Sequence, residues 1–227
     1  MKSYFLTPIG YIFCAMFLIV SGLAFASCTL LEQSTTSLGQ YFIWLMIIFA
    51  VLIPLLTMKL FADDRKTRTD QILLTSPVSV FSIVMGKYLA ALTVFGATFV
   101  VNSLNFVLLS MYGEPNAASI FMNILGVFLL GAAFIAIGLF LSSLTESQLI
   151  AAVSAIGVNA AMLLISLVAA KIENSFWRTF LKMFSVIDRF VPFTHQMLDV
   201  SAIIYYISLA AIFLFLTTRV IEKRRWA

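Results

Sequence analysis

Six long apolar runs alternate with short polar segments along the chain. An α-helix of about 20 apolar residues is long enough to cross the hydrocarbon core of a bilayer. We therefore expect an all-α integral membrane protein with six transmembrane helices, near residues 11–31, 41–61, 84–112, 120–142, 149–170 and 202–221. Pro54 lies inside the second run and is expected to kink that helix without ending it. The first run is about twice the length of a signal-peptide apolar region, so it is expected to remain as a span.

A polar segment, residues 62–87, separates the second apolar run from the third. It contains, in order, Asp63, Asp64, Arg65, Lys66, Arg68, Asp70, then Ile72, Leu73, Leu74, and finally Thr75, Ser76, Pro77. The hydroxyl of Thr67 or Thr69 suits a helix N-cap, and Pro77 limits the helix to about two turns. The pattern predicts a short cytosolic helix at residues 69–76, with a Leu/Ile surface and a ring of charges suited to docking on a partner. A charged loop that only sets topology is the alternative.

A second amphipathic pattern occupies residues 172–198, before the last apolar run. Apolar residues recur every three or four positions, at Ile172, Phe176, Phe180, Phe184, Ile187 and Val191. Polar residues fill the opposite face, at Asn174, Arg178, Lys182, Ser185 and Arg189. This periodicity is typical of a helix that lies in the membrane interface or dips into it. We expect Pro192 to end that helix.

Composition and charge fit a single membrane domain over residues 1–227. Apolar residues make up 62% of the chain and charged residues 11%, with a mean hydropathy of +1.07. Six spans place both termini on one side, and ten of the 14 Lys and Arg residues lie on that side. Because cytoplasmic loops carry an excess of Lys and Arg, we expect both termini and residues 62–87 in the cytoplasm, at the plasma membrane. The net charge of +4 then reflects topology and does not indicate nucleic-acid binding.

Several kinds of chemistry lack the residues they need. No Asp or Glu lies in the middle third of a predicted span, whereas ion-coupled carriers usually need buried ionisable groups. Cys14 and Cys28 are about 21 Å apart along one helix and cannot form a disulfide, and no Cys/His cluster offers a metal site. The chain has no GxxxxGK(S/T) motif, so we expect it neither to bind ATP nor to be an enzyme. His195 is interpreted as an interfacial residue, with a proton sensor as the alternative.

Uncharged polar residues enter two of the spans. Asn102 and Asn105 lie one turn apart in the third, and Asn159 lies in the fifth. Their ordinary role is hydrogen bonding between helices, and the alternative is a wall of the substrate pathway. The fourth and fifth spans also carry pairs of small residues four positions apart, such as Ala132 and Ala136. Such pairs let helices approach closely, so we expect both spans to be interior helices.

Four stretches of the chain resemble one family of membrane proteins. They are YFLTPIGYIF (residues 4–13), LLTSPVSVFSIVMGKYLAA (73–91), GAAFIAIGLFLSSLTESQLIAA (131–152) and DVSAIIYYISLAAIFLFLTTRVIEKRRW (199–226). They are similar to permease subunits of type-2 ABC exporters, particularly the branch of gliding-motility and nitrous-oxide-reductase-maturation permeases. The likeness covers nearly the whole chain in order. It departs at residues 68–71, where members of the family often carry a Gly-Thr-hydrophobic-Glu run.

The resemblance implies a half-transporter in a bacterial plasma membrane. Such a subunit dimerises with a second copy or a sister permease and binds two cytosolic ABC ATPase subunits, which hold ATP-Mg and perform the hydrolysis. The helix at residues 69–76 would be the coupling helix, and the outer amphipathic segment would match the re-entrant helices of the family. We hypothesise that Ile72, Leu73 and Leu74 enter a groove of the ATPase. The charged residues Asp63, Asp64, Arg65, Lys66 and Arg68 would set orientation, and Thr69, Asp70, Ser76 and Pro77 would complete the interface.

Two other classes of function remain open at this stage. An ion-coupled carrier or a channel would work without an ATPase. A scaffold subunit would anchor a membrane complex without moving a solute.

Overall fold

The computed structural model describes residues 8–30, 38–69, 78–106, 117–172, 174–194 and 199–225. In these ranges all regular structure is helical. Six helical segments are long and apolar enough to cross a membrane: Gly10–Cys28, Gly39–Lys66, Val80–Phe106, Ile120–Leu144, Gln148–Lys171 and Val200–Arg225. The prediction of an all-α protein with six membrane-length helices is thus confirmed.

The first three spans differ from the predicted ranges mainly at their ends. Helix α2 (Pro8–Phe25) continues into a π-helical turn, η1 (Ala26–Leu30). Helix α3 (Leu38–Thr57) is followed after one residue by α4 (Lys59–Lys66), so helical structure extends into the charged segment. Helix α6 (Val80–Asn102) starts four residues earlier than predicted. It does so because the Ser79 side chain caps it by accepting a hydrogen bond from the amide of Ser82.

Helix α8 (Ala117–Leu144) is the centre of the bundle. Its residues 133–139 are almost completely buried, and α3, α9 and α12 (Val200–Arg225) all pack against it. The fifth span, α9 (Gln148–Lys171), is interior on one side only, because 28% of its apolar window is buried against 61% for α8. The expectation that both are interior helices therefore holds within this chain for α8, whereas α9 keeps an exposed face.

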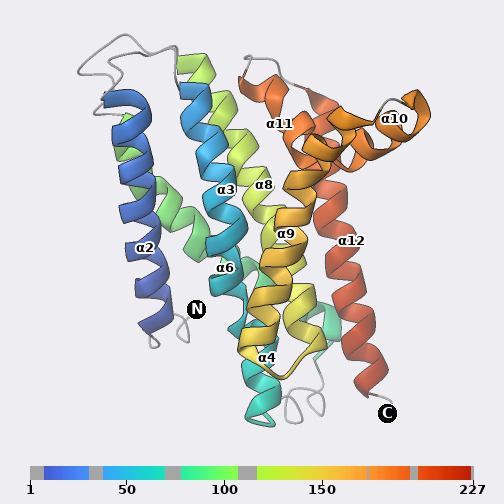
Figure 1. Ribbon diagram of the computed structural model, residues 1–227. Helices are drawn as coiled ribbons and strands as arrows, with labels where there is room; N and C mark the ends of the chain where they lie inside the picture. Colours follow the sequence, from blue (N-terminus) through green and yellow to red (C-terminus); the bar gives the residue numbers. More distant parts are fainter. Residues whose placement is uncertain are drawn as a thin grey trace.

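The outer amphipathic segment consists of two helices, α10 (Ser175–Phe184) and α11 (Val186–Thr194), instead of one. Ser185, which was assigned to the polar face, is fully buried and accepts a hydrogen bond from the Asp188 amide at 3.1 Å. This cap starts a new helix and changes its phase, so α11 buries Val186, Phe190 and Phe193. The prediction that Pro192 ends the helix is wrong, because α11 continues to Thr194. Helix α10 projects from the bundle (Figure 1) and exposes its aromatic residues.

The bundle has two chemically different ends (Figure 1). Helix α4, the turn between α8 and α9, and the last turn of α12 lie at one end, which we call the α4 end. Helices α10 and α11 lie at the other, which we call the α10 end.

Candidate functional site at the α4 end

Pro54 changes the hydrogen bonding near the end of α3. Proline has no amide hydrogen, so the carbonyl of Ala50 loses its ordinary partner within α3. The side-chain amide of Asn159 on α9 donates to that carbonyl instead, at 3.5 Å. One turn later the helix is interrupted at Met58, and α4 begins at Lys59. A polar residue of another span thus binds the backbone of α3 beside Pro54, and the kink expected there stays a prediction.

The side chain of Ser142 on α8 holds the first turn of α4. Its hydroxyl oxygen accepts hydrogen bonds from the amides of Phe61 and Ala62, each at 3.1 Å, and donates to the carbonyl of Met58 at 3.0 Å. Unpaired amides at a buried helix start are costly, and one hydroxyl satisfies two of them here. Gly138, one turn earlier on α8, makes this approach possible, because a Cβ atom at that position would collide with Thr57.

Replacing Ser142 by alanine is expected to destabilise α4. Loss of a capping side chain typically costs about 0.5–2 kcal/mol, and two buried amides lose their partner in this case. Thermal unfolding of the detergent-solubilised protein should show a lower midpoint. Ser143→Ala is the matched control, since the Ser143 hydroxyl bonds only to the Phe140 carbonyl of its own helix. Equal midpoints for the two variants would contradict the capping role of Ser142.

Lys87 on α6 joins α4 to the third span. Its ammonium group donates to the backbone carbonyl of Leu60 and to the carboxylate of Asp64. The nitrogen also lies 4.6 Å from the centroid of the Phe61 ring. The Lys87 and Asp64 side chains are 21% and 28% exposed, so the ion pair is screened less than a surface pair.

The turn between α8 and α9 holds the other side of α4. Arg65 donates to the carboxylate of Glu146 at 2.8 Å, and the side-chain amide of Gln148 donates to Asp63 at 2.7 Å. Three successive charged residues of α4 therefore bond to two different parts of the bundle. We call Asp63, Asp64, Arg65, Lys87, Glu146 and Gln148 the α4 cluster. Helix α4 cannot move as a unit without disturbing α6 or the α8–α9 turn.

The end of α4 corrects one prediction. Thr67, predicted as a possible helix start, is the C-cap of α4. Arg68 follows with a φ of 57°, and its amide donates to the Arg65 carbonyl while the amide of Thr69 donates to the Asp64 carbonyl. This pair of bonds is a Schellman motif, in which glycine is the usual left-handed residue. Arginine in this conformation costs about 1–2 kcal/mol.

The structure divides the predicted docking residues into three sets. Asp63, Asp64 and Arg65 turn toward the bundle and are partly buried. Lys66, Arg68 and Thr69 are exposed. The remaining ones lie outside the described residues: Asp70, Ile72, Leu73, Leu74, Ser76 and Pro77. His195 also lies outside them. The sequence did not reveal that Ser142, Lys87, Glu146 and Gln148 contact α4, although the polar run SSLTESQ between two apolar runs was a signal.

The three asparagines do not share one location. A hydrogen-bond network joins α2, α3 and the end of the third span, and it consists of Ser21, Tyr41, Asn102 and Asn105. The Asn102 oxygen accepts from Ser21 at 2.8 Å and from Asn105 at 3.0 Å, and its amide donates to the Tyr41 hydroxyl at 3.0 Å. The bonds to Ser21 and Tyr41 join different helices, whereas the bond between the two asparagines lies within the third span. Asn159 is on the other side of α3, where its side-chain oxygen is buried and has no hydrogen-bond partner among the residues that the structure describes.

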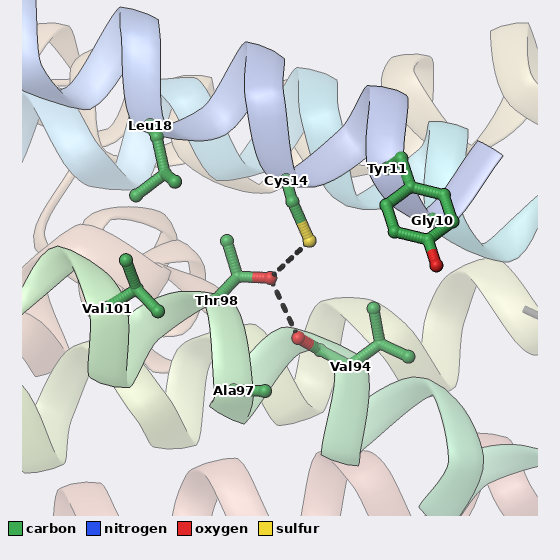
Figure 2. Close-up of a pocket in the computed structure, with 8 residues that line it drawn as sticks. All are labelled: Gly10, Tyr11, Cys14, Leu18, Val94, Ala97, Thr98 and Val101. Atoms are coloured by element: carbon green, nitrogen blue, oxygen red, sulfur yellow. Dashed lines mark hydrogen bonds between the residues drawn. The ribbon is translucent and has the colours of Figure 1, made fainter. Parts of the chain in front are cut away.

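A small cavity of about 140 Å³ lies between α2 and α6 (Figure 2). Its lining is apolar apart from the polar groups of Tyr11, Cys14 and Thr98, and the Cys14 sulfur lies 3.0 Å from the Thr98 hydroxyl oxygen. That hydroxyl donates to the carbonyl of Val94, so its hydrogen is already used within α6. The lining has no charged side chain, and this cavity offers no catalytic chemistry. The α4 cluster remains the candidate site.

Six membrane-length helices and an ionic cluster gathered at one end define a multi-pass membrane protein. The model of the ABC-2 family transporter protein matches residues 25–221. This match covers most of the chain, so the protein belongs to the ABC-2 family and is a membrane permease component of an ABC transporter. An ABC ATPase is the general partner of such a component. No curated protein matches the chain.

Proposed function

We propose that this permease subunit dimerises and couples ATP hydrolysis by separate cytosolic ATPase subunits to export of a substrate. The α4 end faces the cytoplasm of a bacterial cell, and ATP-Mg is bound by the ATPase. The observation that carries this proposal is the α4 cluster. A force applied to the segment after α4 acts on α6 through Lys87 and on the α8–α9 turn through Arg65 and Asp63.

Arg68 supports docking at this place. Its backbone adopts a left-handed conformation that glycine would adopt without cost. An arginine nevertheless occupies this position, and its side chain is exposed. Backbone strain of this kind persists mostly where a side chain is needed for function. Together with Lys66 it offers two exposed cations beside residues 70–77, in which we place the contact of Ile72, Leu73 and Leu74 with the ATPase.

The exposed face of α9 supports a dimer. Exposed residues recur every three or four positions along this face: Ile150, Val153, Gly157, Ala161, Leu164 and Val168. Nothing lies within 4 Å of a Cβ atom built at Gly157. Membrane helices associate through such faces, because small residues let the backbones approach. Asn159 lies on the opposite, buried side of α9, so dimerisation would leave its bond to α3 intact. The sequence resemblance favours the gliding-motility and nitrous-oxide-reductase-maturation branch of the family.

Purification of the complex from native membranes tests the proposal. We expect an ATP-hydrolysing subunit to co-purify with the wild-type chain, in a complex with two permease copies or with a sister permease. Two variants are expected to weaken ATPase binding by about tenfold, the loss of one strong interface contact. One is Leu73→Asp combined with Leu74→Asp, and the other is Arg68→Gly, in which glycine keeps the end of α4 unstrained.

Arg178→Gly is the control, because it removes an exposed arginine at the α10 end. It is expected to retain the ATPase. Full retention of the ATPase by the Leu73/Leu74 variant would show that the docking segment is wrongly assigned. Transport by the isolated chain, without any ATPase, would refute the proposal as a whole.

A further inference from the structure

A groove lies between the first turns of α6 and the last turns of α12, at the α4 end. It encloses about 460 Å³, within the range of about 300–1,000 Å³ typical of small-ligand sites. Its lining consists of Phe81, Met85, Ala211, Leu214, Phe215, Thr218, Arg219 and Glu222. None of these residues belongs to the α4 cluster.

The larger part of the groove lining is apolar. Phe81 from α6 and Phe215 from α12 are each 57% exposed, although both are large aromatic residues. Met85, Ala211 and Leu214 complete this part. Both helices are membrane-length, so the groove opens between two candidate spans. A hydrocarbon chain is the ligand for which such a lining is suited.

The rim of the groove is cationic. The Arg219 guanidinium lies 5.0 Å from the centroid of the Phe215 ring and 3.3 Å from Glu222. Lys223 is exposed one turn further along the same face, and Arg224 and Arg225 follow it. Glu222 pairs with Arg219, Lys223 adds a further positive charge, and the first turn of α6 has no acidic residue. The positive end of the α6 dipole adds to the positive potential at this rim.

We propose that this groove binds an anionic glycerophospholipid. One acyl chain lies between α6 and α12 against Phe81, Met85 and Phe215. The phosphate and its anionic headgroup lie at Arg219 and Lys223. Basic residues at the end of a span attract anionic lipids. A choline headgroup would instead place a further positive charge beside these two basic side chains. The bound lipid fastens α12 to the start of α6, the helix that carries Lys87. This inference holds whether or not the ATPase docks as proposed.

Lipid binding to the purified full-length chain in detergent tests the charged part of the site. Phosphatidylglycerol and phosphatidylcholine with identical acyl chains are compared by native mass spectrometry. We expect the wild type to retain phosphatidylglycerol preferentially. Arg219→Gln combined with Lys223→Gln should weaken that binding by about fivefold per charge. Arg178→Gln combined with Lys182→Gln removes two exposed cations from α10 and should leave it unchanged.

A second pair of variants tests the apolar part. Ala211 is exposed in the groove, so Ala211→Trp should fill it and abolish the lipid preference. Ile212→Trp adds a similar volume to an exposed neighbour outside the lining and should keep the preference. Equal retention of the two lipids by the wild type would overturn the proposal. Unchanged phosphatidylglycerol binding in either the Arg219/Lys223 variant or Ala211→Trp would also overturn it.

Discussion

Replacing Lys87 by methionine is expected to release α4 from α6. The variant leaves the Leu60 carbonyl and the half-buried Asp64 carboxylate without the ammonium group that they share. The Asp64 carboxylate is left partly buried without its partner, which costs about 1–3 kcal/mol and more for a charged group, so we expect a loss of about 3 kcal/mol. Local opening of α4 should then become about a hundredfold more frequent. Hydrogen exchange of the amides in residues 60–66 measures this directly.

Two further variants show whether this effect comes from the ion pair. Lys182→Met removes an exposed lysine at the α10 end and should leave exchange in α4 unchanged. Asp64→Asn combined with Lys87→Met should cost less than the sum of the two single variants, because the residues contact each other. In the assembled transporter, Lys87→Met should also uncouple ATP hydrolysis from transport. Normal exchange protection of α4 in Lys87→Met would refute the role given to Lys87.

Gly131→Ala is expected to have a comparably large effect on folding. A Cβ atom at Gly131 would lie closer than 3.0 Å to two atoms of the Phe95 ring. Phe95 is 1% exposed and packs against Phe49, Phe99 and Phe128, so its ring has no free space into which it can turn. Overpacking a core typically costs about 1–3 kcal/mol, and the upper end applies where the neighbours are rigid. Thermal unfolding in detergent should show the loss.

A second substitution should reverse that loss in part. Phe95→Leu removes the ring atoms that the new methyl group would meet, so Gly131→Ala with Phe95→Leu should be more stable than Gly131→Ala alone. Gly22→Ala serves as the control, because nothing lies within 4 Å of a Cβ atom at Gly22. Equal stability of Gly131→Ala and Gly22→Ala would show that α6 and α8 are not packed as described.

Hydrophobicity determined most of what could be predicted about the fold. Runs of apolar residues report the spans because the bilayer demands a fixed length of helix with internal hydrogen bonds. Helix ends depend instead on single contacts that the sequence does not display. Thr67 was a reasonable N-cap by residue type, yet the preceding helix continues to Lys66 because Ser142 supports its start. In the same way, buried Ser185 divides the outer segment into two helices.

The sequence predicted which residues the candidate site contains in α4, but it did not predict how they are arranged. The sequence identified the charges at residues 63–68 because they interrupt an apolar pattern. It did not show which of these charges face the bundle, since that depends on partners such as Lys87 and Glu146, more than 20 and 80 residues away along the chain. The Leu/Ile surface at residues 72–74 and the choice of ATPase partner stay predictions.

The bond from Asn159 to the Ala50 carbonyl has a consequence for motion. The Ala50 carbonyl of α3 relies on a donor from a neighbouring span, and the backbone of residue 54 cannot replace it because that residue is proline. Sliding α9 along α3 would leave two polar groups bare in hydrocarbon, where each costs several kcal/mol. We therefore expect these two spans to move together during a transport cycle, with any hinge elsewhere in the molecule.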